Sequence, residues 1–308
     1  MANLIIGIHG LSNKPPKSTL SDWWKAAIKE GLDQNCGIED ADFEFEMVYW
    51  ADLLYKNPQH TDKNFDFDSL YTDQPYIPAV QGNLKEYKEG WLDNIREAVS
   101  NTGGRVLDAA REYTGLGAVS DWLLDQKLRD LAFYYDKTRL ILDRNERARE
   151  ARQVLMDELM NTLKRRRGDR MMLIAHSMGT IISYDVLREL GQQSVSFPVQ
   201  HFVTIGSPLG LPIVKESIYS ERRYSDVPVR TPTVVTERWV NYADRKDVVA
   251  IDTHLRDDFR ENDSGIRVED DLVLNSYVGL NGDVNSHKSY GYLRTPELSS
   301  HIRSFLEL

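Results

Sequence analysis

A serine that follows a wholly apolar run is the residue best suited to chemistry in this sequence. The stretch MMLIAHSMGTIISY, residues 171–184, has the pattern of a buried strand that turns at Ser177 into a helix. Such a turn exposes the hydroxyl, and small residues at positions 175 and 179 let the helix approach the strand closely. The pattern therefore predicts that Ser177 is a nucleophile. The alternative is that Ser177 only caps the helix that follows it.

A serine nucleophile needs a general base, because an alcohol is a poor nucleophile near neutral pH. Histidine suits this task, and the chain contains seven histidines. His287 lies in a loop after the last predicted strand and is one candidate for the base. His301 falls within the final predicted helix, where we expect it at the surface, and His201 opens a strand at the end opposite the serine.

A carboxylate is needed to fix the tautomer of the base and to stabilise its imidazolium form. The stretch WVNYADRKDVVA, residues 239–250, supplies two candidates. Asp244 ends the predicted strand directly, and Asp247 follows it by three residues. Asp244 has the alternative of a local ion pair with Arg245 or Lys246.

The pentapeptide AHSMG, residues 175–179, is the G-x-S-x-G motif with alanine in place of the first glycine. On this motif and its strand–turn–helix context, the chain resembles an α/β-hydrolase of the lipase and esterase type. The resemblance covers residues 1–50 and 170–308, and it does not account for the long middle segment. It implies a triad in the chain order serine, acid, histidine.

Carried over residue by residue, the resemblance assigns the nucleophile to Ser177 and the base to His287. Asp247 resembles the acid of the family's D-x-V pattern and is preferred, with Asp244 as the alternative. The resemblance also implies an oxyanion hole formed by the backbone N–H groups of Leu11 and Met178.

Further residues are expected to line the substrate site: His9, Gly10, His176, Ser207, Pro208 and Leu209. Two of these segments have a purely structural alternative. The pair His9-Gly10 would then be a plain strand end, and Gly206-Ser207-Pro208 a structural turn.

The elements that position these residues alternate along the chain. Residues 4–9, LIIGIH, predict a buried strand, and a helix follows in which Ser18 or Ser21 is the expected cap. Strands are also predicted at residues 43–50, 171–176, 199–207, 238–244 and 271–275, and helices at 150–167, 178–190 and 296–308. Strands separated by helices predict an α/β fold with a mostly parallel sheet covered on both faces, here an α/β-hydrolase fold in a single domain of residues 1–308.

The middle segment, residues 51–145, interrupts this alternation and is predicted to be a helical insertion or cap. Apolar residues recur at helical spacing in residues 83–101 and again in residues 120–142. Both stretches predict amphipathic helices. A site at the edge of a sheet needs a cover that excludes water, which favours a cap, although an apolar stripe at this spacing also suits a core helix.

Composition limits the remaining possibilities. The formal net charge is −10, which disfavours nucleic acid and anionic lipid as general partners. The single cysteine, Cys36, excludes an intramolecular disulfide, and no basic segment precedes a long apolar run at the start, so we expect a cytoplasmic protein. No stretch is apolar enough for an integral membrane segment, and the chemistry calls for no metal or organic cofactor. The sequence carries no signal for an oligomeric state.

The expected function is therefore cleavage of a carboxylic ester by a serine hydrolase, with a small-molecule ester or lipid-like substrate. A thioester or amide would use the same groups. The first alternative is a catalytically silent protein that keeps the hydrolase fold as a binding module or scaffold. The second is a membrane-peripheral lipid deacylase that binds lipid through residues 51–145.

Overall fold

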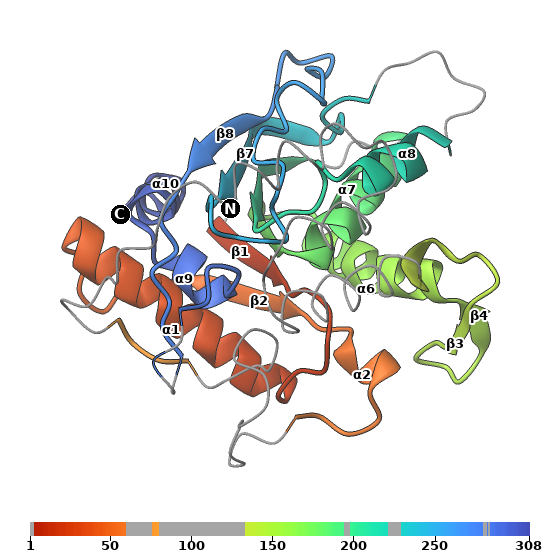
Figure 1. Ribbon diagram of the computed structural model, residues 1–308, viewed down its shortest axis with the longest axis horizontal. Helices are drawn as coiled ribbons and strands as arrows, with labels where there is room; N and C mark the ends of the chain where they lie inside the picture. Colours follow the sequence, from red (N-terminus) through yellow and green to blue (C-terminus); the bar gives the residue numbers. More distant parts are fainter. Residues whose placement is uncertain are drawn as a thin grey trace, which may run out of the picture.

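A six-stranded parallel sheet forms the centre of the protein. The computed structural model describes residues 3–59, 76–79, 133–193, 198–220, 229–279, 282 and 284–308. Within them, the strand order across the sheet is β2-β1-β5-β6-β7-β8 (Figure 1). The strands are β1 (Asn3–Ile8), β2 (Glu44–Val48), β5 (Arg170–His176), β6 (Val199–Ile205), β7 (Val235–Ala243) and β8 (Glu269–Leu272). Every pairing in this sheet is parallel, which confirms the predicted fold class.

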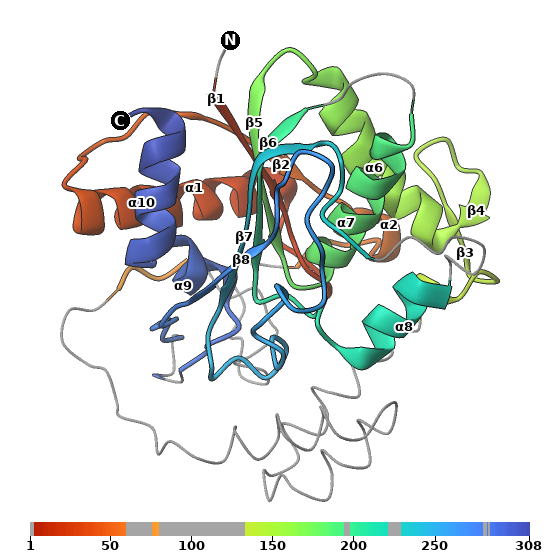
Figure 2. The same ribbon diagram turned by 90° about the horizontal axis from the view of Figure 1, so that it is seen from above.

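Helices cover both faces of the sheet. Figure 2 shows α1 (Lys17–Cys36), α9 (Ser289–Leu293) and α10 (Pro296–Leu306) on one side. On the other side lie α6 (Ala151–Arg165), α7 (Met178–Gly191) and α8 (Pro212–Ser220). Alternate residues of the central strands feed the two resulting cores: Ile6 and Leu173 pack with α6 and α7, whereas Ile5 and Met172 pack with α1 and α10. Strands buried on both faces explain the wholly apolar runs in the sequence.

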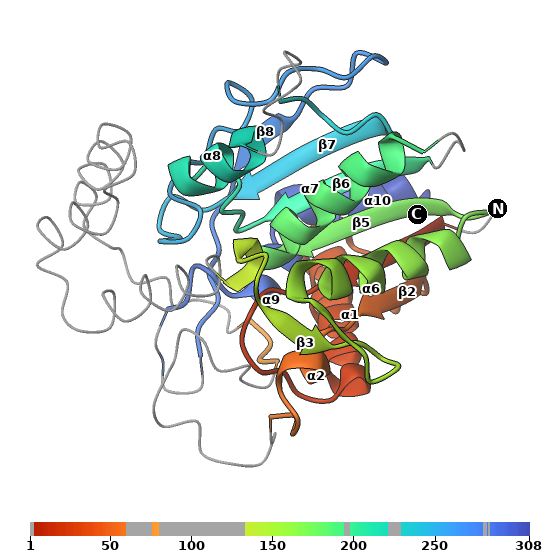
Figure 3. The same ribbon diagram turned by 90° about the vertical axis from the view of Figure 1, so that its right-hand side faces the viewer.

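The direction of strand order reverses between β1 and β5. After β1 the chain passes through α1 to β2 at the edge of the sheet, and it later returns through α6 to β5 on the other side of β1. Helix α1 and helix α7 therefore leave neighbouring strands toward opposite faces (Figure 3). Ligands of open α/β sheets bind in the crevice outside the carboxyl ends of the strands at such a switch point. Ser177 follows β5 directly, and His9 and Gly10 are the first two residues after β1.

The start of α1 differs from the prediction. Pro16 occupies the N-cap position, and no side-chain hydrogen bond caps the helix, so Ser18 and Ser21 lie inside it and are not caps. Proline lacks an N–H group and has a fixed φ, so it starts a helix without a capping side chain. The predicted apolar face of α1 is confirmed, because Leu20, Trp24, Ala27 and Ile28 are all buried.

The segment 51–145 is described only in part. Its described elements are α2 (Ala51–Leu54) and β3 (Leu140–Leu142), which pairs antiparallel with β4 (Ala148–Glu150). The helix predicted at residues 83–101 lies outside the described residues. The helix predicted at residues 120–142 is wrong at its end, where the chain turns at residues 137–138 and continues as β3.

The end of the chain corrects a second expectation. His301 is 4% exposed in α10, not at the surface as predicted. It belongs to a buried chain of hydrogen bonds in which Tyr242 Oη lies 3.0 Å from His301 Nδ1, and His301 Nε2 lies 2.8 Å from His201 Nδ1. His201 Nε2 in turn lies 3.0 Å from Glu237 Oε2. A carboxylate only accepts hydrogen bonds, so His201 donates to Glu237. By the same argument His301 donates to His201, and the Tyr242 hydroxyl donates to His301.

Candidate active site

Ser177 lies at the sharp turn between β5 and α7. Its backbone has φ 54° and ψ −127°, in the left-handed region that non-glycine residues rarely occupy. No side-chain hydrogen bond from Ser177 caps α7, so the capping alternative does not describe this residue. A Cβ at Gly179 would lie 2.8 Å from the backbone oxygen of His9, which shows how closely α7 packs on the end of β1. The sequence predicts that small residues at positions 175 and 179 allow a close approach in this turn, and at Gly179 the close neighbour is the end of β1.

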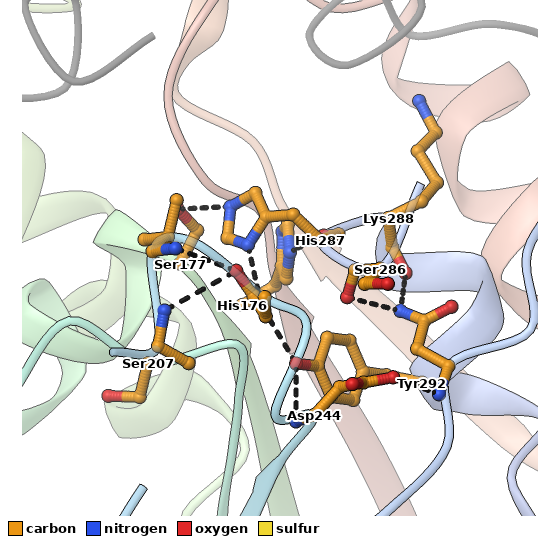
Figure 4. Close-up of polar contacts among 12 residues, drawn as sticks. His176, Ser177, Ser207, Asp244, Ser286, His287, Lys288 and Tyr292 are labelled. Carbon is orange, nitrogen blue, oxygen red and sulfur yellow. Dashed lines mark hydrogen bonds and ion pairs between the residues drawn. The ribbon is translucent and has the colours of Figure 1, made fainter. Parts of the chain in front are cut away.

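Three side chains from different parts of the chain form one line of hydrogen bonds (Figure 4). Ser177 Oγ lies 3.0 Å from His287 Nε2, and His287 Nδ1 lies 2.8 Å from Asp247 Oδ2. Because a carboxylate is only an acceptor, Nδ1 carries the proton, and Nε2 is left to accept from the serine hydroxyl. This tautomer is the one a general base requires.

Asp247 is buried and fully hydrogen bonded. Its Oδ1 accepts from the N–H groups of Val249 at 2.8 Å and Ala250 at 3.3 Å, while Oδ2 contacts His287 and Tyr292. Asp244, the alternative acid, does not contact the histidine. It accepts from the N–H groups of Lys246 and Asn275, and burial raises the pKa of its carboxyl.

Tyr292, which sequence reasoning did not single out, joins the two carboxylate segments. Its hydroxyl donates to Asp247 Oδ2 at 2.7 Å and accepts from the N–H of Asp244 at 3.0 Å. Burial, followed by the charge of Asp247, raises the pKa of the Tyr292 phenol well above its ordinary value, so the phenol stays protonated and remains a donor. The sequence signal was an aromatic residue five positions after His287, with nothing to mark its hydroxyl as a partner of the acid.

The loop of His287 is held through its backbone. His176 Nε2 lies 2.8 Å from the carbonyl oxygen of His287, and the two rings are 4.7 Å apart (Figure 4). His176 was predicted to line the substrate site, and the structure places it against the histidine loop. Asn275, also missed from sequence, donates from Nδ2 to the carbonyl oxygens of Ser286 and Lys288.

The segment after β1 lies directly beside the serine. A Cβ at Gly10 would lie 2.8 Å from Ser177 Cβ and 3.3 Å from its Oγ. His9 is buried, its Nδ1 lies 2.7 Å from the oxygen of Gly10, and its Nε2 lies 3.2 Å from the N–H of Trp50. His9 thus fixes the Gly10–Leu11 peptide, and in a trans peptide the Leu11 N–H points opposite to the carbonyl.

Met178 is the first residue of α7. The first N–H groups of a helix have no partner within it, and the helix dipole adds positive potential there. The structure therefore brings both predicted oxyanion residues next to Ser177: Met178 follows it in the chain, and Leu11 follows the glycine that contacts it.

The Ser207 turn lies deeper. Ser207 Oγ donates to Thr180 Oγ1 at 2.9 Å and accepts from the N–H of Leu209 at 3.2 Å, and Leu209 is fully buried in the core beside α7. Pro208 between them is also buried. These contacts fit the structural turn noted as the alternative for this segment. The turn also packs against the acid and the base, because a Cβ at Gly206 would lie 2.8 Å from Asp247 Oδ2 and 3.1 Å from His287 Nδ1. That the segment lines the substrate site stays a prediction.

Among the described residues, no group of three His, Cys, Asp or Glu side chains is placed to hold a metal ion. None of the helices in the described ranges combines the length and the apolar character that crossing a bilayer requires.

A comparison with protein-family models finds a match for part of this chain. Residues 117–220 match the family model described as lecithin:cholesterol acyltransferase, and this segment includes β5, Ser177, α7 and β6. No curated protein matches the chain. The parallel sheet and this match together show an α/β-hydrolase fold, and the similarity to an acyltransferase family supports a lipase-like hydrolase superfamily for this chain.

Proposed function

We propose that the protein is a serine hydrolase that cleaves carboxylic esters of lipid-like molecules through Ser177, His287 and Asp247. The observation that supports this most is the continuous line of hydrogen bonds from the serine hydroxyl through the imidazole to a buried carboxylate. The lecithin:cholesterol acyltransferase similarity supports the lipid-like substrate class.

In the acylation step, Ser177 Oγ bonds to the ester carbonyl carbon while its proton moves to His287 Nε2. The carbonyl electrons move onto oxygen, and the N–H groups of Leu11 and Met178 donate to this oxyanion. When the carbonyl re-forms, the bond to the alcohol oxygen breaks, and His287 returns the proton to that oxygen. The alcohol leaves, and Ser177 carries the acyl group.

In the deacylation step, water gives a proton to His287 Nε2 and its oxygen bonds to the acyl carbon. A second oxyanion forms at the same donors and collapses. The bond to Ser177 Oγ breaks, and the imidazole returns its proton to the serine. The carboxylic acid leaves and the resting enzyme is restored. Throughout, Asp247 stabilises the imidazolium, and its four hydrogen bonds keep it in place.

The proposal is tested by labelling with a fluorophosphonate, which reacts with activated serines. We expect one labelled peptide, with the label on Ser177, and no labelling of Ser177→Ala. Ser183→Ala is the matched control, because Ser183 is an equally buried serine on α7 that is outside the hydrogen-bonded line. A folded wild-type protein that stays unlabelled and cleaves none of a series of p-nitrophenyl esters would contradict the proposal and favour the scaffold alternative.

Transfer of the acyl group to an alcohol is a second candidate, favoured by the acyltransferase similarity of residues 117–220. The chemistry is the same, except that the alcohol oxygen takes the place of water in the second step. Assays with a long-chain alcohol or a sterol alongside the ester would reveal a new ester product. Release of free acid alone at every acceptor concentration would limit the activity to hydrolysis.

A further inference from the structure

The backbone on both sides of His287 is held by one buried side chain. Asn275 is 1% exposed, and its Nδ2 donates to the carbonyl oxygen of Ser286 at 2.9 Å and to that of Lys288 at 2.9 Å. Figure 4 shows these two residues next to His287, with dashed lines from both carbonyl oxygens to one amide nitrogen. The Ser286–His287 peptide, which precedes the proposed base, and the Lys288–Ser289 peptide, which lies one residue beyond it, are therefore fixed by the same amide group.

Asn275 is itself fixed to the segment that carries the acid. Its N–H donates to Asp244 Oδ2 at 2.5 Å, and its Oδ1 accepts from the N–H of Tyr277 at 3.2 Å. The turn that ends in Asp247 begins at Asp244, whose carbonyl oxygen accepts from the Asp247 N–H at 3.0 Å. Through Asn275, the loop of the base is thus connected to the turn of the acid.

We propose that Asn275 is a positioning residue, which holds the His287 backbone so that the ring reaches Asp247 and Ser177 together. This inference rests on the proposed hydrolase function. The hydrogen bonds of Asn275 go to Asp244 and to the backbone of Ser286, Lys288 and Tyr277, and none goes to the side chains of Ser177, His287 or Asp247, so it acts through the backbone beside the base. A rotation of the His287 backbone would swing Nε2 away from Ser177 Oγ, and a misplacement of about 1 Å costs on the order of 100-fold in rate.

The chain offers a matched control in Asn262. This asparagine is also buried, and its Nδ2 donates to the carbonyl oxygens of Pro232 and Val235. Its Oδ1 accepts from two backbone N–H groups, those of Ser264 and Ile266. Val235 begins β7, so Asn262 lies at the end of the sheet opposite Asp244. Aspartate at either position removes two donors to backbone carbonyls, and the chemical change is the same.

The experiment compares Asn275→Asp with Asn262→Asp by p-nitrophenyl ester kinetics and by the rate of fluorophosphonate labelling. For Asn275→Asp we expect kcat and the labelling rate to fall by about 10- to 100-fold with KM unchanged. For Asn262→Asp we expect wild-type kcat, although both variants lose stability. Asn275→Ser, which is smaller and neutral, is the second variant, and the same selective fall in kcat is expected in its folded fraction as judged by circular dichroism.

A readout that does not need activity is the downfield proton resonance of His287 Nδ1–H, assigned by its loss in His287→Ala. We expect it to broaden or shift in Asn275→Asp and to stay unchanged in Asn262→Asp. Wild-type kcat in the folded Asn275 variants, or an equal fall in Asn262→Asp, would overturn the positioning role and leave the hydrolase proposal standing. A wild-type protein that is never labelled would instead overturn the proposed function itself.

Discussion

Replacement of His301 by glutamine is expected to weaken the dependence of stability on pH. In the wild type, His301 accepts from the Tyr242 hydroxyl and donates to His201, all within the buried space between β6, β7 and α10. A proton added to His301 Nδ1 would turn the Tyr242 hydroxyl from a donor into an acceptor, and a proton added to His201 Nδ1 would place two N–H donors against each other. Glutamine also donates and accepts, but it does not titrate.

The size of the effect follows from the pKa of the buried imidazole. Burial, and after it the neighbouring His201, lowers the pKa of His301 from 6.5 to about 3. The unfolded chain therefore takes up the proton first, and stability is lost as pH falls below about 6.5. Between about pH 8 and about pH 5, this linkage removes about 2 kcal/mol from the free energy of unfolding. His201, whose pKa burial also lowers, adds to the loss.

Other buried groups act in the opposite direction. Burial raises the pKa of Asp244 and raises that of Asp258 to about 6, so both carboxyls favour the folded state as pH falls. The quantity to compare between variants is therefore the difference in the free energy of unfolding between the same two pH values. It is measured by urea unfolding, followed through tryptophan fluorescence. In His301→Gln the pH difference should shrink by about 2 kcal/mol. The exposed His254 supplies the control His254→Gln, which should keep the wild-type difference. An unchanged pH difference in His301→Gln would refute the reasoning.

Three further outcomes are expected. Asp247→Asn should lower kcat on the order of 10⁴-fold, because the wrong tautomer of the base is favoured. Asp244 has no hydrogen bond to the base, so Asp244→Asn should lower kcat far less. Equal losses of kcat in p-nitrophenyl ester assays would contradict the assignment of the acid. Tyr292→Phe should cost about 2 kcal/mol in urea unfolding and also lower kcat, since a buried donor to a carboxylate is lost. Arg152→Met should cost about 2 kcal/mol in the same unfolding assay, because it removes the shorter of the two described ion pairs of the buried Asp185, at 2.7 Å, and leaves the pair with Arg188 at 3.3 Å; the more exposed Arg144 serves as a control, and Arg144→Met should cost under about 1 kcal/mol.

The predictable parts of the fold are the elements whose residue types follow a pattern within the element itself. The apolar runs of β1 and β5 and the helical spacing in α1 identify strands and helices, because burial on two faces or on one stripe sets the residue types directly. The turn at Ser177 was also predictable from a local pattern, an apolar strand followed by small residues and a helix. That the small residue at 179 packs on the end of β1 was not in that pattern and comes from the structure.

The burial of His301 in α10 was predictable from the helical spacing of its apolar neighbours. Leu298, Ile302 and Phe305 are all buried in α10, and His301 lies three residues after the first of them, on the same face. The spacing therefore carried the signal for a buried histidine. The surface position expected for His301 followed instead from the general tendency of polar residues to be exposed.

Residues that act through distant contacts left no local signal. Asn275 binds carbonyl oxygens that are 11 and 13 residues away in the chain, and Tyr292 binds a carboxylate 45 residues away. Such pairs depend on where loops meet at the end of the sheet. Periodicity and motif spacing describe single elements, so they say nothing about which loops face each other.

The left-handed backbone conformation of Ser177 lowers the stability of the fold at the residue that the proposed activity requires. A non-glycine residue held there stores about 1–3 kcal/mol of strain, a substantial part of the roughly 5–15 kcal/mol by which a domain is stable. Glycine at this position would relax the turn and remove the hydroxyl in one change. We therefore expect Ser177→Gly to unfold at a higher temperature than Ser177→Ala, because glycine adopts this backbone conformation without strain. At this position the change that relieves the strain is also one that removes the proposed nucleophile.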